Sequence, residues 1–518
     1  MVRSRLFGIE TEFGCLVRDE ALGTPEQVVT RLKDYAYNEK RIGLLDMHSR
    51  DYAFEPALCG GFLTNGGRLY IDAVGDHLEY ATPEVVRLAS AVAYDRAGHR
   101  VILDLVDDLF SREAVSFHNN SVDHFGGHTF GCHENYSVSI QDERVRPALM
   151  LIVSFLVTRQ IYAGAGRVGG HRITRNPRAV SRRPGRHEID TVWVGSLYGV
   201  EPDPTVDFQL SQRADHILHT ISGRVRFSRA LINPKHDTFS DLTGEWRLHV
   251  LFGEANMSEY ATALKLGTTC LVLQLAEMDH IPTSPWVASP IETLRSVSRD
   301  GALRWEVRLG DGRTISAVDQ QRMFLAAAKE TLAGSSEDAD WTLREWETVL
   351  DALESDYHAL ADRLDWVAKR SMLETFMEAD GLSWGDEVLH SLDLEYHNID
   401  PRAGLHYAFA ELRGMKRVTT DDAIRRASVA PPPDTRARAR GRVVQALIES
   451  GARNYIIDWD AVNVIGSESI HRLLLDTAAG PPESDVKQFC EAAKCLGEEG
   501  DGGDGPAGLF GIDLGLDL

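Results

Sequence analysis

The chain has few cysteines for its length, and none of them is spaced as a pair. Its 518 residues include six cysteines without a CxxC motif. Neither a zinc motif nor a disulfide framework is therefore predicted. The six positions are Cys15, Cys59, Cys132, Cys270, Cys490 and Cys495. This usage fits a protein of the reducing cytoplasm.

Long hydrophobic runs are also missing. The longest, from Ala148 to Val157, is about half of the ~20 residues that a membrane-spanning helix needs, so we expect a buried element there. The first residues, MVRSRLFGIETEFG, place Glu10 and Glu12 where a signal peptide has its apolar core. Neither a targeting segment nor a membrane partner is expected.

Positive charge is scarce. The chain has 55 Lys and Arg against 78 Asp and Glu, and its formal charge of −23 disfavours nucleic acid as a general partner. One stretch, from His171 to His187, reverses this sign and is either a solvated loop or a docking patch for an acidic partner. Its arginines are Arg172, Arg175, Arg178, Arg182, Arg183 and Arg186.

The common nucleotide-binding motifs do not occur. The sequence has no P-loop, kinase-type glycine loop or GxGxxG, so any ATP site must use another scaffold. Cys132 and His133 do not form a nucleophile and base either, because adjacent residues of a strand face opposite sides.

The hydrophobic periodicity predicts an α+β protein. Strands are expected over residues 5–14, 68–72, 136–140 and 248–252, and helices over 85–97, 148–162 and 258–278. Residues 320–380 have an almost wholly helical pattern. A helix over 437–450 and a strand-like run over 454–464 follow a proline connector and predict a small C-terminal domain. We therefore expect a main domain over residues 1–430, the small domain over 431–480 and a disordered acidic, Gly- and Asp-rich tail over 481–518.

Two carboxylates share one face of the first predicted strand. Glu10 and Glu12 are two residues apart, which places them about 6 to 7 Å apart and lets each hold a separate hard cation. Magnesium bound with the phosphates of ATP is one reason for a sheet to tolerate such a pair. A solvated strand face is the alternative.

A second segment, NGGRLYIDAVGDHLEYATPE, is densely charged. It places Arg68, Tyr70 and Asp72 on one strand face and adds Glu79 and Glu84 nearby. Arginine can neutralise phosphate, aspartate can accept a proton from a nucleophile, and glutamate can complete a metal shell. An exposed acidic loop would have the same composition.

Four polar clusters accompany strand-like sequence farther along. They are His118-Asn119-Asn120, GCHENY with His133, Ser211-Gln212-Arg213 and Arg247-Leu248-His249. A lone histidine is more often a core or surface residue than a ligand. Together, however, the segments supply the carboxylates, imidazoles and arginines that phosphoryl transfer needs.

These segments, in this order, resemble the family of Pup ligases and Pup deamidases/depupylases, which act on the small ubiquitin-like protein Pup and are related to glutamine synthetase. The resemblance spans roughly residues 5–470 and is closest to the Pup–protein ligase branch. It is carried by FGIETEFG, NGGRLYID with EYATPE, GCHENY, FLVTRQ with GAGRV, LSQRADHI, LHVLFGEANMSE, LKLGTT, ADRLDWVAK, PPPDTRARARG and IDWDAV.

The resemblance implies a glutamine synthetase-like curved antiparallel sheet that cradles ATP and Mg²⁺. It implies that ATP phosphorylates the C-terminal glutamate of Pup or a Pup-like modifier, which is then joined to a lysine of a target protein. By motif, Asp72 is implied as the catalytic base. The implied metal ligands are Glu10, Tyr70 and Glu79, with Glu12, His133 and His249 in the same site. The implied ATP contacts are Arg68, Thr82 and Trp459, and Arg213 lies in a motif that lines the phosphates.

The ligase and depupylase branches share this site. EYATPE, GCHENY and the VGxH segment after Asp72 favour a ligase, whereas the intermediate length from Gly14 to Asn65 leaves a depupylase open. Three features depart from the family pattern and suggest a divergent branch. They are the segment INPKHDTFSD, the arginine-rich stretch and the seven-residue step from Asp72 to Glu79. A modifier-binding pseudoenzyme and a small-molecule glutamate–amine ligase are the remaining alternatives.

Overall fold

The computed structural model describes residues 5–45, 59–72, 77–123, 128–175, 198–222, 229–235, 245–466 and 469–499. Most of the arginine-rich stretch lies outside these ranges, and its described residues form a strand, β9 (His171–Arg175), paired with β10 (Tyr198–Pro202). Residues 73–76, 236–241 and 500–518 lie outside the described residues as well.

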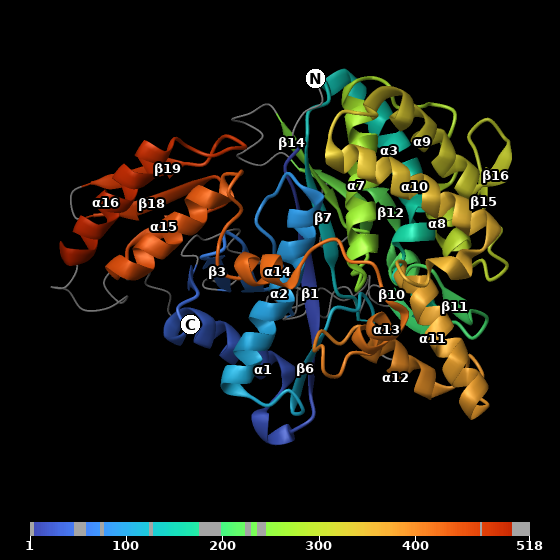
Figure 1. Ribbon diagram of the computed structural model, residues 1–518, viewed down its shortest axis with the longest axis horizontal. Coiled ribbons are helices and arrows are strands. Elements are labelled where there is room, and N and C mark those ends of the chain that lie inside the picture. Colours follow the sequence, from blue (N-terminus) through green and yellow to red (C-terminus); the bar gives the residue numbers. More distant parts are fainter. Residues whose placement is uncertain are drawn as a thin grey trace.

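A ten-stranded sheet forms the centre of the main domain (Figure 1). Its strand order is β12-β13-β14-β7-β1-β5-β4-β3-β2, with β6 paired to β1. All pairs are antiparallel except β12–β13, which is parallel. The strands are β1 (Phe7–Val17), β2 (Gly43–Leu45), β3 (Gly60–Leu63), β4 (Arg68–Ile71), β5 (Leu78–Ala81), β6 (Val115–His118), β7 (Cys132–Val138), β12 (His219–Ile221), β13 (Ala230–Lys235) and β14 (Trp246–Val250).

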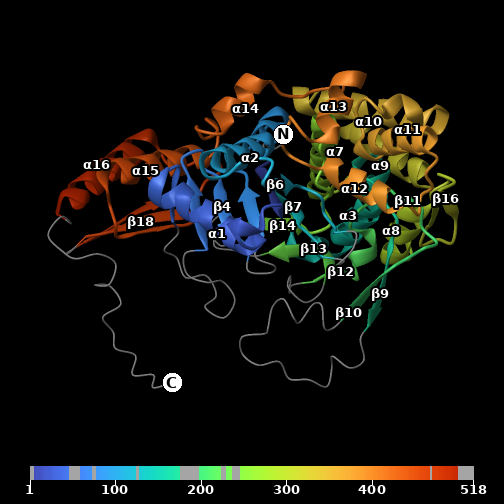
Figure 2. The ribbon, with the colours of Figure 1, turned by 90° about the horizontal axis from the view of Figure 1, so that it is seen from below.

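Helices cover one face of this sheet. Figure 2 shows α2 (Leu88–Leu109) and α7 (Glu259–Glu277) on the same side of the strands. The alternating residues Phe7, Ile9 and Phe13 of β1 are buried against this layer. Because side chains alternate along a strand, the intervening residues of β1 face the other side of the sheet, here called the open face.

The apolar run seen in the sequence belongs to α3 (Asp142–Ala163). This helix is long and apolar enough to span a membrane by length and composition, but 78% of its most apolar window is buried inside the protein. It packs against α7, α8 (Pro290–Arg299) and α9 (Ala317–Leu332). The expectation of a buried element is confirmed.

The predicted helical region is also confirmed. Residues 317–380 contain α9, α10 (Glu337–Ser355) and α11 (Asp365–Asp380), followed by α12 (Glu387–Tyr396), α13 (Leu405–Arg413) and α14 (Asp421–Ala427). Other elements of the main domain are α1 (Pro25–Asp34), the hairpin β15 (Glu306–Arg308) and β16 (Thr314–Ser316), and the pair β8 (Arg167–Val168) and β11 (Phe208–Gln209).

The elements from residue 437 to residue 499, here called the C-terminal domain, share a hydrophobic cluster beside the main sheet. This domain contains α15 (Ala437–Ser450) and the three-stranded sheet β17 (Tyr455–Ile457), β18 (Ala461–Ile465) and β19 (Ile470–Leu474). It also contains α16 (Glu483–Glu499), so the expectation of disorder from residue 481 onward is wrong for this part. Val486, Phe489 and Ala493 are buried against the domain core with helical spacing, which the acidic composition concealed.

Candidate active site

The strand register places the polar side chains of four strands on the open face of the main sheet. Glu12 of β1 lies opposite Glu79 of β5, which in turn lies opposite Tyr70 of β4. On the other side of β1, Glu10 lies opposite His133 of β7. Residues that are directly opposite in neighbouring strands share a face, so these four strands build one continuous polar surface.

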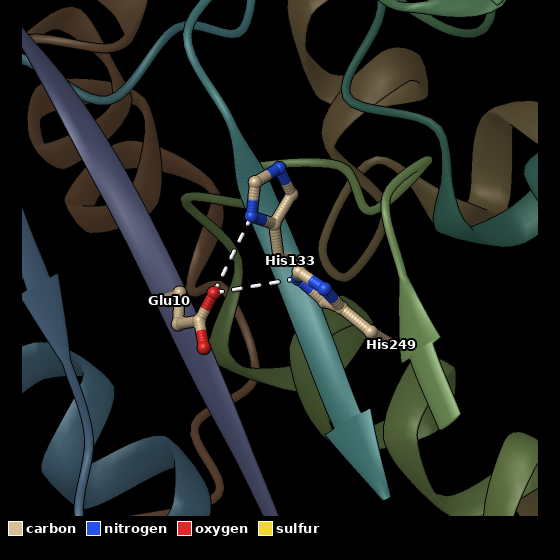
Figure 3. A group of neighbouring side chains, drawn as sticks. All are labelled: Glu10, His133 and His249. Carbon is tan, nitrogen blue, oxygen red and sulfur yellow. Dashed lines mark ion pairs between the residues drawn. The ribbon is translucent and has the colours of Figure 1, made fainter. Parts of the chain in front are cut away.

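Glu10 is the centre of the first group, the Glu10 cluster, which also contains His133 and His249 (Figure 3). Oε2 of Glu10 lies 3.4 Å from Nδ1 of His133 and 3.4 Å from Nε2 of His249. One potential ligand atom from each residue falls within 4.8 Å of the others. Burial raises the pKa of Glu10, but His249 and His133 together lower it by more than burial raises it. The net pKa is therefore well below the usual value.

His249 has an unusual environment for a buried imidazole. It is 3% exposed, and neither ring nitrogen has a partner at hydrogen-bonding geometry among the described residues. Burial, followed by the charge of Lys235, lowers its pKa well below the usual value, which favours the neutral ring, and the charge of Glu10 opposes this shift. A buried imidazole whose nitrogens have no hydrogen bond within the described part of the chain and which lies 3.4 Å from a carboxylate fits a metal ligand.

Glu12, Asp72 and Glu79 form the second group, the carboxylate cluster. One oxygen from each lies within 4.8 Å of the others. Burial, then the charges of Asp72 and Glu12, raise the pKa of Glu79 well above 4.5. Like charges this close are unfavourable in a buried site unless a cation offsets them.

The donor chemistry distinguishes the two groups. The carboxylate cluster offers only oxygen, which is what Mg²⁺ prefers, and the hydroxyl of Tyr70 hydrogen-bonds Glu79 beside it. The Glu10 cluster combines one carboxylate with two imidazoles, a set that also accommodates softer divalent ions. The residues present therefore fit divalent cations at both positions.

Gly131 separates the two groups. A Cβ atom at this position would lie 2.4 Å from Oε1 of Glu12 and 2.6 Å from Nε2 of His133. A larger residue would therefore displace a side chain of each cluster, which explains glycine before Cys132 in the GCHENY segment. Cys132 itself faces the covered side, where it is 2% exposed and contacts Thr11.

A cavity of about 270 Å³, the interdomain cavity, lies between the main sheet and the C-terminal domain. Thr82 lines it from the end of β5, Trp459 lines it from the loop between β17 and β18, and Glu10 connects it to the Glu10 cluster. The hydroxyl of Thr82 accepts a hydrogen bond from the backbone N–H of Ile9 at 3.0 Å. Two of the predicted ATP contacts thus share one cavity although they belong to different domains.

The two predicted arginines lie outside the lining of this cavity. The guanidinium carbon of Arg68 lies 4.2 Å from the ring centroid of Tyr70, next to the carboxylate cluster. Arg213 lies in the turn after β11 and donates to the carbonyl of Phe130 at 2.9 Å. Burial lowers the pKa of Arg213, and the neighbouring charge of Glu12 opposes this shift.

Three further polar residues belong to the site but were not predicted individually. Asn135 donates to Oε1 of Glu10 at 2.9 Å, and Arg247 donates to Asn135 at 2.7 Å. His77 lies 2.9 Å from Oε2 of Glu12 through its Nδ1. Strand parity could have identified two of them, because Asn135 is two residues from His133 and Arg247 is two residues from His249.

The fold and these donor sets define an α+β protein whose sheet offers a site suited to divalent cations and a phosphate-bearing ligand. Sequence comparison places it more narrowly. Residues 5–463 match the family described as Pup-ligase protein, and the chain belongs to this family.

Two curated relatives illustrate the range of the family. A Pup–protein ligase of Nocardioides sp. (strain ATCC BAA-499 / JS614) is 35% identical, over 88% of this chain and 92% of the relative. A depupylase of Acidothermus cellulolyticus (strain ATCC 43068 / DSM 8971 / 11B) is 34% identical, over 90% of this chain and 93% of the relative. Overall similarity therefore does not separate the two activities.

Solved structures confirm the α+β architecture. The ligase PafA in complex with the prokaryotic ubiquitin-like protein Pup matches with a TM-score of 0.76 and 29% identity, over 95% of this chain and 92% of that chain. PafA in complex with ADP matches with a TM-score of 0.70 and 29% identity, over 91% and 94%.

Proposed function

We propose that the protein is an ATP- and Mg²⁺-dependent ligase that joins the C-terminal glutamate of Pup, or of a Pup-like modifier, to lysine side chains of target proteins. One observation carries the proposal: the Glu10 cluster and the carboxylate cluster lie side by side on the open sheet face, and Glu10 also lines the interdomain cavity with Thr82 and Trp459. The relatives named as ligases and the PafA complexes with Pup and ADP support it.

The reaction has two balanced steps. A γ-carboxylate oxygen of the modifier's terminal glutamate attacks the γ-phosphorus of ATP, and ADP leaves with the electrons of the broken P–O bond. The lysine amine then attacks the acyl carbon, its C–O bond to phosphate breaks, and inorganic phosphate leaves. The amine loses a proton in this second step, so a base must lie beside the acyl phosphate.

Different residues of the chain bind the metal, bind the nucleotide and accept the proton in these two steps. Mg²⁺ held by the Glu10 and carboxylate clusters, with Tyr70 beside the latter, would neutralise charge on the transferring phosphoryl group. Arg68 and Arg213 provide fixed positive charge near the same face, and Thr82 and Trp459 hold the nucleotide in the interdomain cavity. Asp72, at the end of β4, accepts the amine proton.

A depupylase is the second candidate. It is favoured by the relative of that name and by the intermediate length of the connection from Gly14 to Asn65. In that case water replaces the lysine amine, and the isopeptide bond of a conjugate is cleaved rather than formed.

The deciding experiment presents both reactions to one preparation. The protein is incubated with ATP, MgCl₂, Pup ending in glutamate and a lysine-bearing acceptor, and separately with a preformed conjugate, and products are followed by intact mass. We expect conjugate from the wild type and a loss of about 10² to 10⁴-fold in rate for Asp72→Asn. Asp311→Asn, an exposed hairpin residue, is the matched control.

Cleavage of the preformed conjugate without ligation would replace the ligase by the depupylase. Binding of Pup with neither reaction would favour the pseudoenzyme. Phosphate release with a free amine in the absence of Pup would indicate the small-molecule ligase.

A further inference from the structure

Arg440 of α15 joins the C-terminal domain to the main sheet behind the interdomain cavity. Its side chain is completely buried, and its Nε and Nη2 donate to the carbonyl of Gly66 at 3.0 and 2.8 Å. Its Nη1 donates to the carbonyl of Trp459 at 3.0 Å. The guanidinium also forms an ion pair with Glu84, so it contacts three separate segments at once.

The same guanidinium stacks on aromatic rings. Its central carbon lies 4.6 Å from the ring centroid of Trp459 and 5.4 Å from that of Phe62. The two rings meet edge to face, with centroids 5.1 Å apart. A guanidinium over an indole is an attractive arrangement, so Arg440 fixes the ring of Trp459 as well as its backbone.

The backbones of α15 and of residues 64–66 are in close contact here. Gly66 has a φ of +81°, and a Cβ atom on it would lie 2.8 Å from the carbonyl oxygen of Ala437. A Cβ atom on Gly441 would lie 2.4 Å from the carbonyl oxygen of Thr64. The start of α15 therefore rests directly on the turn that precedes β4.

Each of the three anchored segments carries one predicted ATP contact. Gly66 is two residues before Arg68, Glu84 is two residues after Thr82, and the third anchor is Trp459 itself. We propose that Arg440 is a positioning residue that holds Arg68, Thr82 and Trp459 in the mutual geometry that binds ATP. This inference rests on the proposed function, and Arg440 itself contacts none of the reacting groups.

The test compares Arg440→Lys with Arg442→Lys. Lysine keeps the charge of residue 440 but lacks the planar fork whose separate nitrogens donate to Gly66 and Trp459. Arg442 lies on the same helix and pairs with Glu483 inside the C-terminal domain, away from the sheet, which makes it a matched control. The measurements are calorimetric titration with Mg·ATP, and kcat and KM for both ATP and the modifier.

We expect Arg440→Lys to bind ATP about tenfold more weakly or worse, since several charge-assisted hydrogen bonds are lost. Its KM for ATP should rise by the same factor, whereas its kcat at saturating ATP and its KM for the modifier should stay near wild type. A purely structural role would lower the active fraction and reduce kcat without this split. Arg442→Lys should match the wild type in every parameter.

Glu84→Gln provides a second route, because it keeps the shape of Glu84 while removing the charge that pairs with Arg440. It should weaken ATP binding in the same direction. Wild-type affinity for ATP in both variants would overturn the inference, as would a change in kcat alone. If the wild type itself failed to bind Mg·ATP, that result would contradict the proposed function, and the inference about Arg440 would be rejected together with it.

Discussion

Glu134 and Glu79 are buried carboxylates on opposite faces of the main sheet, and their surroundings differ in charge. On the covered face, Glu134 is completely buried, and each of its oxygens accepts a hydrogen bond from Arg159 at 2.8 Å. On the open face, Glu79 is 3% exposed and lies beside Glu12 and Asp72.

The pKa shifts follow this difference. Burial raises the pKa of Glu134, but Arg159 more than offsets this, so its net pKa is lowered. Burial raises the pKa of Glu79 too, and the neighbouring carboxylates raise it further. Glu134 has its countercharge within the protein, whereas the charges that shift the pKa of Glu79 are those of other carboxylates, which fits a place for a cation.

The largest expected effect comes from breaking the pair on the covered face. Arg159→Met leaves Glu134 buried without a countercharge, which should destabilise the protein by about 3 to 5 kcal/mol. Calorimetric thermal midpoints measure this. Arg18→Met, which breaks an exposed pair with Glu395, should cost less than about 1 kcal/mol. Equal shifts in the two variants would contradict the assignment of Arg159.

A pH-dependent effect of intermediate size is expected at Glu84. Burial raises its pKa, but Arg440 and Arg436 bring the net value down to about 2. A lowered carboxyl pKa contributes stability that is present above the unfolded-state value of 4.5 and is lost as pH falls toward 2. Glu84→Gln should therefore lose about 2 to 3 kcal/mol at neutral pH.

Urea midpoints of the wild type and Glu84→Gln should converge as pH falls below 4.5. The control is Glu337→Gln, whose partner Arg87 is exposed. A gap between Glu84→Gln and the wild type that stays constant with pH would rule out a charge effect at this residue.

The smallest expected effect, at Glu79, is the most direct test of the difference between Glu79 and Glu134. Because the folded state raises the pKa of Glu79, wild-type protein without divalent ions loses stability as pH rises from 4.5 through that raised value. With chelator at neutral pH, Glu79→Gln should thus be more stable by about 1 to 2 kcal/mol. Saturating MgCl₂ should reverse the order, because only the wild type keeps the full ligand set.

Thermal midpoints with chelator and with MgCl₂ test this reversal. Glu134→Gln should be less stable than the wild type in both conditions, since its partner is Arg159 and not a cation. If Glu79→Gln behaved like Glu134→Gln, the carboxylate cluster would be a structural feature rather than a cation site.

Local patterns predicted much of the fold. The alternation in β1 identified both faces of the strand, and α15 was predicted with its observed bounds of Ala437 and Ser450. The composition of the last residues was misleading, because the helical spacing of Val486, Phe489 and Ala493 outweighs the surrounding Asp and Glu once the domain core is available.

The residue types of the site were predictable, but their grouping was not. Strand parity placed Glu10 and Glu12 on one face and separated Cys132 from His133. The division into two clusters depends on which strands flank β1, with β5 on one side and β7 on the other. Nothing local to β1 specifies those neighbours.

The sequence by itself determined the α+β class, the parity of each strand and the supply of carboxylates, imidazoles and arginines, because these follow from periods of two and of about 3.6 residues along the chain. The tertiary structure alone decided that Asp72 joins Glu12 and Glu79, that Thr82 and Trp459 share a cavity, and that Arg440 connects three segments. These contacts join residues far apart in the chain, and their positions are set by packing and register across the whole sheet.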